Sequence, residues 1–317
     1  MLRYTFNRIL YLIPVLLILS IAVFALVHSL PGDVIDIVMS GEENISDPVV
    51  RKALEKELGL DKPIYVQYFI WLNRILHGNF GKSMVTRRPV SLELFERIPA
   101  TIYLALVGVV LSLIIAVPLG TIAAVKRNTF VDYISQTVSL FGISIPEFWF
   151  AIMCVLLFAL YLGWLPSSGY HSPTDNLGLS LQHLILPAVA IGFRQAAITT
   201  RLTRSSMLDE VQKEYVDTAR SLGLSERKVI YKYTLRNAMI PTLTISGLQL
   251  AQLLGGTVVI ETIFAWPGIG LALYQAIITR DFPLIQAGIL ILGTKVVLIN
   301  LLVDLMYRVL NPRVRLA

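Results

Sequence analysis

The chain has 317 residues, of which 55% are hydrophobic and 15% are charged, and its formal net charge is +6. A soluble domain usually carries about 25% charged residues, so the low share here points to a protein that lies in lipid. The basic residues are not gathered in one patch with interleaved aromatic residues, which argues against a nucleic-acid partner. The single cysteine, Cys154, excludes an intrachain disulfide and argues against a cysteine-based metal site.

Six segments are long and apolar enough to cross a membrane as helices, because about 20 mostly apolar residues span the hydrocarbon core. They are Ile9–Leu30, Thr101–Val125, Tyr133–Leu162, His183–Thr203, Ala238–Ile263 and Leu284–Leu305. The first is predicted to be an uncleaved membrane helix, since its apolar run is longer than that of a signal peptide. The third contains Pro146, which predicts a kink.

The basic residues of the connecting segments predict the orientation in the membrane. The segment around Lys126, the region 201–236 and the C-terminal tail are basic, whereas the segment 163–182 contains no Lys or Arg. Basic short loops face the cytoplasm, so both termini are predicted to be cytoplasmic. The region 31–98 is nearly balanced in charge, with nine basic and ten acidic residues. It is predicted to be extracytoplasmic, because long segments cross regardless of charge.

The sequence therefore predicts an all-α integral membrane protein with six transmembrane helices. Its predicted parts are an N-terminal transmembrane helix (1–30), an extracytoplasmic region with short helices (31–98), a five-helix core (99–310) and a cytoplasmic tail (311–317). Within the core, the segment 207–237 is predicted to lie in the cytoplasm. In the extracytoplasmic region Asp47 is a predicted N-cap of a short helix. Tyr65, Phe69, Leu72 and Leu76 then follow helical spacing, which predicts an amphipathic helix. Such a helix lies in the membrane interface or under a partner, or packs on the chain's own spans.

No motif in the sequence predicts catalysis. Gly81-Lys82-Ser83 resembles the end of a phosphate-binding loop, but Leu76 stands where the first glycine is required, and no strand precedes the run. No two of the four histidines have metal-ligand spacing, and no Ser-His-Asp or Cys-His set can be assigned. We expect neither a catalytic residue nor a metal site in this chain.

Polar residues inside the predicted spans are candidates for function, because a charge in the bilayer is costly unless it is paired or hydrated. The candidates are Glu147, Arg194, Lys295, Asn300 and Asp304. Two readings stay open for each of them. The side chains line a substrate path, or they pair with one another or with a second membrane subunit. Arg201 and Arg204, near the inner surface, are predicted to extend to it.

A charged segment separates the fourth and fifth predicted spans. Its first part, EYVDTARSL, predicts a helix that ends at Gly223, and Ser225 is the predicted N-cap of a second helix with Glu226 in its first turn. Two short helices joined at a glycine form a rigid elbow that suits a groove on a cytoplasmic partner. An ordinary solvated loop is the alternative.

This segment resembles the EAA motif of the membrane subunits of binding-protein-dependent ABC importers, Glu-Ala-Ala-x3-Gly-x9-Ile-x-Leu-Pro. The residues at the motif positions are Asp217, Thr218, Ala219, Gly223, Tyr233, Leu235 and Arg236. Asp217 replaces the Glu of the motif, Thr218 the first Ala, Tyr233 the Ile and Arg236 the Pro. These departures resemble the variant of the motif in the dipeptide, oligopeptide and nickel permeases. Further matches, among them VHSLPGD, ELGLDKP, ETIFAWPGIG and NPRVR, extend the resemblance over essentially the whole chain. By resemblance the chain is identified as a first-permease (B-type) subunit.

The resemblance implies a type I ABC importer permease with the MetI-like fold, in the bacterial inner membrane. It implies as partners a second homologous permease, two cytoplasmic ATPases and an extracytoplasmic substrate-binding protein. ATP and magnesium are then bound by the ATPases, and this chain binds no cofactor. The implied substrates are dipeptides, oligopeptides or glutathione-like peptides. Nickel chelates and haem are alternatives, and a stand-alone secondary transporter is the alternative from another class.

The resemblance also implies two sets of site residues. The ATPase-docking or coupling helix contains Asp217, Thr218, Ala219, Arg220 and Gly223. A turn at the outer end of the fifth span contains Glu261, Trp266, Pro267 and Gly268. This turn is a candidate outer gate or contact for the binding protein, and simple termination of the helix is the alternative.

Overall fold

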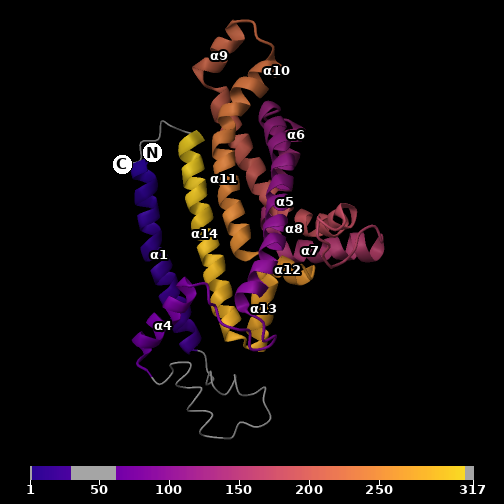
Figure 1. The fold of residues 1–317 in the computed structure, drawn as a ribbon. Helices are drawn as coiled ribbons and strands as arrows, with labels where there is room; N and C mark the ends of the chain where they lie inside the picture. Colours follow the sequence, from indigo (N-terminus) through magenta and orange to yellow (C-terminus); the bar gives the residue numbers. More distant parts are fainter. Residues whose placement is uncertain (1, 30–61, 311–317) are drawn as a thin grey trace. The chain divides into compact units, whose positions relative to one another are not determined.

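The computed structural model describes residues 2–29 and 62–310 (Figure 1). Within these residues the secondary structure is helical, and the one extended pairing is an isolated bridge between Lys82 and Pro89. The predicted all-α architecture is therefore confirmed. The elements are α1 (Leu2–Ser29), α4 (Ile64–Leu76), α5 (Val90–Val125), α6 (Phe130–Ser144), α7 (Glu147–Cys154), the π-helix η1 (Val155–Tyr161), α8 (Leu177–Val211), α9 (Glu214–Ser221), α10 (Glu226–Lys228), the π-helix η2 (Val229–Thr234), α11 (Leu235–Gly256), α12 (Val258–Ile263), α13 (Ile269–Thr279) and α14 (Phe282–Leu310). The predicted helix at Asp47 lies outside the described residues.

Four described helices are long and apolar enough to cross a membrane. They are Val90–Val125, Leu177–Val211, Glu226–Gly255 and Phe282–Leu301. The pair formed by α6 and α7–η1 passes the same test together, which makes up to five if this bent pair is one span. The apolar part of α1, Leu10–Leu26, is shorter. The six predicted spans correspond to these five and α1, and a crossing by α1 stays a prediction.

The helices of the fourth and fifth spans extend beyond the predicted bounds. The helix α8 continues to Val211, and the helix of the fifth span begins already at Glu226. Hydropathy marks only the part of a helix that suits lipid, whereas charged turns continue the same backbone hydrogen bonding outside it. The fifth span also ends earlier than predicted, because α11 stops at Gly256 and α12 is a separate short helix.

The predicted kink at Pro146 is a complete break of the helix. The helix α6 ends at Ser144, α7 begins at Glu147, and their axes are bent by 102° (Figure 1). Pro146 is the N-cap of α7, a position where its missing N–H costs no intrahelical hydrogen bond. The proline thus starts a new helix in a new direction.

The chain divides into two compact units. The first contains the residues up to Ile98 together with Ala272–Thr294, and the second contains Pro99–Leu271 and the residues from Lys295. In the first unit α4 packs on α1 through aromatic side chains: the Phe24 ring centroid lies 5.5 Å from that of Tyr68 and 5.4 Å from that of Trp71.

The amphipathic helix predicted around residues 65–76 is confirmed as α4, but its packed face is not the predicted stripe. Tyr68 and Trp71 contact α1, whereas Tyr65, Phe69 and Leu76 are exposed. The helix therefore packs on the chain's own first helix with one side and leaves a second apolar side uncovered by the described residues. An exposed apolar side of this kind suits a helix that lies in a membrane interface.

In the second unit α8 is the central helix, and its small residues let neighbouring helices approach closely. A side chain at Gly120 of α5 would place its Cβ 2.8 Å from the backbone oxygen of Thr200 in α8. Buried Ala190, Ala196 and Ala197 line α8 as well. Helices in lipid associate through such van der Waals contact, because apolar side chains gain little by leaving lipid.

Candidate functional site

The helices α9 and α10 form an elbow beyond the ends of α8 and α11 (Figure 1). Both predicted helices are present: α9 ends at Ser221, shortly before Gly223, and α10 begins at Glu226, directly after the predicted N-cap Ser225. Gly223 between them has a φ of +73°, and a Cβ built there would have no heavy atom within 4 Å. A side chain at this position would be strained by the backbone but would have space. Ser225 is the N-cap residue, but its side chain makes no capping hydrogen bond.

A small apolar cluster holds the elbow together. Val216 and Ala219 of α9 are buried against Val229 at the start of η2. Ala219 is only 6% exposed, so its small side chain permits close packing inside the elbow rather than at its surface. Asp217, Thr218 and Gly223 of the predicted coupling set remain exposed.

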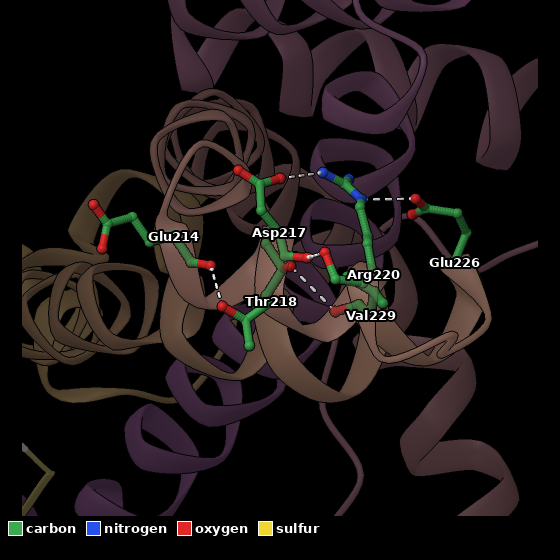
Figure 2. Close-up of polar contacts among 8 residues, drawn as sticks. Glu214, Asp217, Thr218, Arg220, Glu226 and Val229 are labelled. Atoms are coloured by element: carbon green, nitrogen blue, oxygen red, sulfur yellow. Dashed lines mark hydrogen bonds and ion pairs between the residues drawn. The ribbon is translucent and has the colours of Figure 1, made fainter.

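Arg220 links the two helices of the elbow (Figure 2). Its Nη1 lies 3.3 Å from Asp217 Oδ1, and its Nε donates a hydrogen bond of 2.8 Å to Glu226 Oε1. The bond to Glu226 raises the pKa of the Arg220 guanidinium above its usual value. Exposed ion pairs contribute little to stability, so this network mainly sets the angle between α9 and α10. Asp217 thus has a basic partner within the elbow.

Tyr215 connects the elbow to the long helices and was not singled out by the sequence. Its hydroxyl donates to Glu210 Oε2 of α8 at 2.7 Å and accepts from Asn237 Nδ2 of α11 at 3.1 Å. Burial is the main cause that raises the pKa of this phenol above its usual value. The start of α9 is thus tied to both α8 and α11. The only sequence signal was an aromatic residue in a charged segment.

A second connection joins α6 to α8. Arg204 donates to both carboxylate oxygens of Asp132, with Nε–Oδ1 at 2.6 Å and Nη2–Oδ2 at 2.7 Å. Asp132 is fully buried and also accepts from the Asn128 backbone N–H and from Gln136. The sequence did not predict this partner, which offers the Arg204 guanidinium two charge-assisted hydrogen bonds. That Arg204 extends to the membrane surface stays a prediction.

No hydrogen bond or ion pair among the described residues joins Glu147, Arg194, Lys295 and Asn300 to one another. Glu147 and Arg194 interact electrostatically but form no ion pair within 4 Å. The Nζ atom of Lys295 is buried and has no hydrogen-bond partner among the described residues. Asn300 is exposed, and Asp304 lies on α14.

The turn after α12 is built around a buried carboxylate. Glu261 is fully buried and accepts hydrogen bonds from Thr257 Oγ1 at 2.7 Å, from the Leu271 N–H at 2.9 Å and from Thr101 Oγ1 at 3.1 Å. A Cβ at Gly268 would lie 2.4 Å from both carboxylate oxygens, so glycine is required for this approach.

Trp266 connects the same turn to α5. Its indole Nε1 donates to the Ala100 oxygen at 2.9 Å, and its ring is fully buried. Of the four residues predicted for this turn, Pro267 alone is partly exposed, while Glu261, Trp266 and Gly268 are buried. These contacts end one helix and begin the next.

The fold brings together one pair of histidines that the sequence keeps apart. The ring centroids of His171 and His183 lie 4.7 Å from each other. Among the described residues no group of three or more His, Cys, Asp or Glu side chains could hold a metal ion. The pair therefore carries no metal-site assignment.

Long apolar helices around a small-residue core, with a charged elbow between two of them, are typical of a multi-pass membrane protein. The chain belongs to the family described as the binding-protein-dependent transport system inner membrane component, which matches residues 116–316. The family described as the N-terminal part of such membrane components matches residues 1–105. The predicted permease family and its membrane location are confirmed.

Relatives of known name are similar over the whole chain. The dipeptide transport system permease protein DppB of Alkalihalophilus pseudofirmus is 41% identical, with 99% of this chain and 100% of that protein covered. The glutathione transport system permease protein GsiC of Escherichia coli strain K12 is 42% identical, with 99% of each chain covered.

Solved structures support the fold. An inward-facing structure of the MetNI methionine ABC transporter has a TM-score of 0.57 at 19% identity, over 69% of this chain and 96% of that chain. A second crystal form of the same transporter has a TM-score of 0.52. The predicted MetI-like permease fold is confirmed.

Proposed function

We propose that this chain is one of two membrane subunits of an ATP-driven importer that moves di- or oligopeptides, or glutathione-like peptides, into the cell. Membership of the transport family and full-length similarity to a dipeptide and a glutathione permease support the peptide assignment. The second membrane subunit is a homologous permease. An extracytoplasmic binding protein delivers the peptide, and ATP and magnesium are bound by two cytoplasmic ATPases.

The observation that carries this proposal is the α9–α10 elbow. Its exposed residues Asp217, Thr218, Arg220 and Gly223 form the surface that the ATPase contacts. Its buried cluster and the bonds of Tyr215 make it a unit that moves together with the ends of α8 and α11. A displacement of the ATPase is thereby passed to two membrane helices, which exposes the bound peptide alternately on the two sides.

We further propose that the chain crosses the membrane six times, with both termini in the cytoplasm. The four candidate spans among the described residues, the bent pair of α6 and α7–η1, and the apolar helix α1 support this count. Glu147, Arg194, Lys295, Asn300 and Asp304 stay candidates for the substrate path or for pairing with the second permease. Glu261, Trp266, Pro267 and Gly268 stay candidates for the outer gate, with Pro267 as the surface a binding protein reaches first.

The test of the docking surface is Gly223→Asp. The variant forces a non-glycine residue into a φ of +73° and adds a charge at the ATPase-facing turn. We expect the variant chain to insert in the membrane, while radiolabelled peptide uptake falls to background and the ATPases no longer copurify. The matched control is Gly163→Asp, because Gly163 has a φ of +62° and also has no heavy atom within 4 Å of a built Cβ.

Normal uptake by the Gly223→Asp transporter contradicts the docking surface. Equal loss in both variants also contradicts it, since the effect would then come from backbone strain alone. A separate reconstitution distinguishes the class of transporter: uptake requires the partner subunits and ATP if the chain is an importer subunit, whereas uptake by the chain alone on an ion gradient identifies a secondary transporter.

A further inference from the structure

The first unit contains a cavity of about 530 Å³ that the proposed transport role does not use. It lies between the end of α1, the side of α4, the turn formed by residues 79–87 and the first residues of α14. The Gly81-Lys82-Ser83 run that resembled a phosphate loop lines this cavity. Ser83 does not point to a phosphate site, because its hydroxyl donates to the Asp281 carboxylate.

The lining carries positive charge without a compensating acid. Arg74, Lys82 and Arg87 line the cavity, and no Asp or Glu side chain does. Among the described residues none of these three side chains has an ion-pair or hydrogen-bond partner. Three cations around one cavity repel one another, so the arrangement favours a bound anion.

The acidic side chains nearby in this unit have other partners. Asp281 accepts from Ser83 and from the Met84 N–H, and Glu93 accepts from Thr86. Glu96 is paired with Arg88, with Nη2–Oε1 at 2.8 Å. The three cations are therefore not neutralised by the described acids of their own unit.

Aromatic side chains also line the cavity. Phe24, Trp71 and Phe282 line it, and Phe24 and Phe282 are buried. The Trp71 indole Nε1 donates a hydrogen bond of 3.1 Å to Gln286 Oε1, so its polar atom already has a partner. An anionic group attached to an apolar body matches a cavity of this kind.

The cavity lies beside the first turn of a candidate membrane helix, and the ends of a membrane helix meet the lipid headgroups. Phe282 and Pro283 line it and are the first residues of the membrane helix Phe282–Leu301. Beside it, α4 exposes Tyr65, Phe69 and Leu76, an apolar side that suits the boundary between headgroups and acyl chains. A small soluble anion would not explain this exposed side. We propose that the cavity binds the headgroup of an anionic phospholipid, whose phosphate lies among Arg74, Lys82 and Arg87.

The test is a titration of the purified full-length chain with phosphatidylglycerol and, separately, with phosphatidylcholine, read by native mass spectrometry. We expect wild-type protein to bind phosphatidylglycerol at least tenfold more tightly than phosphatidylcholine. Removing one basic residue near anionic lipid weakens binding by about fivefold. The triple variant Arg74→Gln, Lys82→Gln and Arg87→Gln is therefore expected to lose the preference for phosphatidylglycerol, and the double variant Arg74→Lys and Arg87→Lys to keep it.

The matched control removes the same charge from the elbow, as Lys213→Gln, Arg227→Gln and Lys228→Gln, and is expected to keep the wild-type preference. An unchanged preference in the cavity variant, or equal loss in both triple variants, overturns the proposal. If the cavity triple variant does not fold, Arg87→Gln alone provides the same comparison, with an expected loss of about fivefold in the affinity for phosphatidylglycerol. Displacement of phosphatidylglycerol by a millimolar dipeptide also overturns it, because the cavity would then take a peptide carboxylate.

Discussion

Two polar networks stabilise helix breaks in the second unit, and they are built in opposite ways. In the α9–α10 elbow the charged side chains of Asp217, Arg220 and Glu226 are exposed around a small buried apolar cluster. In the turn after α12 the carboxylate of Glu261 is itself buried, and its hydrogen bonds define the turn. Exposed networks tolerate change and leave a surface for a partner, whereas buried networks are costly to break.

The largest effect is expected from Glu261→Ala. The substitution leaves Thr101, Thr257 and the Leu271 N–H without their buried acceptor, which costs about 3–5 kcal/mol. We expect a large loss of thermal stability of the purified chain in detergent. The control is Glu226→Ala in the elbow, which removes an exposed carboxylate and is expected to cost less than about 1 kcal/mol. Equal melting temperatures for the two variants would contradict the comparison.

A somewhat smaller effect is expected at the pair that joins α6 to α8. Asp132→Asn removes the charge that holds Arg204 in its bidentate contact, at a cost of about 2–3 kcal/mol, because the partly exposed Arg204 can turn to water. A double-mutant cycle with Arg204→Gln measures the pair directly. If the two single substitutions are additive in unfolding experiments, the bidentate pair does not stabilise the helix contact.

Tyr215→Phe tests the connection between the elbow and the long helices. It removes the hydrogen bonds to Glu210 and Asn237 while keeping the ring, and we expect a loss of about 1 kcal/mol in stability. The pKa of this phenol is raised in the folded state, so its contribution is fully present below pH about 10 and is lost as the pH rises through the folded pKa. The difference in the free energy of unfolding between the wild type and Tyr215→Phe should therefore be constant from pH 6 to about pH 9. A slope within that range would assign the effect to another group.

The smallest effect on stability is expected from Arg220→Ala. Its ion pairs with Asp217 and Glu226 are exposed, so the loss is less than about 1 kcal/mol. The angle between α9 and α10 is expected to become variable, which lowers peptide uptake several-fold at an unchanged melting temperature. Uptake at the wild-type rate would show that the elbow is held by Val216, Ala219 and Val229 alone.

The elements that local patterns define were predictable. The long apolar runs, the elbow bounded at Gly223 and Glu226 and the break at Pro146 each depend on residues close together in sequence. The actual limits of α8 and α11 were not predictable from hydropathy, because a helix continues past the lipid wherever its backbone bonds are satisfied. The pairing of Asp132 was not predictable from local sequence, because its partner Arg204 stands 72 positions later.

By itself the sequence determined the all-helical membrane architecture, the charged elbow and the motif matches that identify the family, because all of these are encoded in neighbouring residues. Only the tertiary structure decided which polar residues are buried and what they contact. Glu261 meets Thr101 across 160 positions, and Trp266 meets Ala100 across 166. The cations of the cavity likewise come from α4 and from the turn before α5, beside the first residues of α14. Such contacts depend on how distant helices pack, and no local spacing records them.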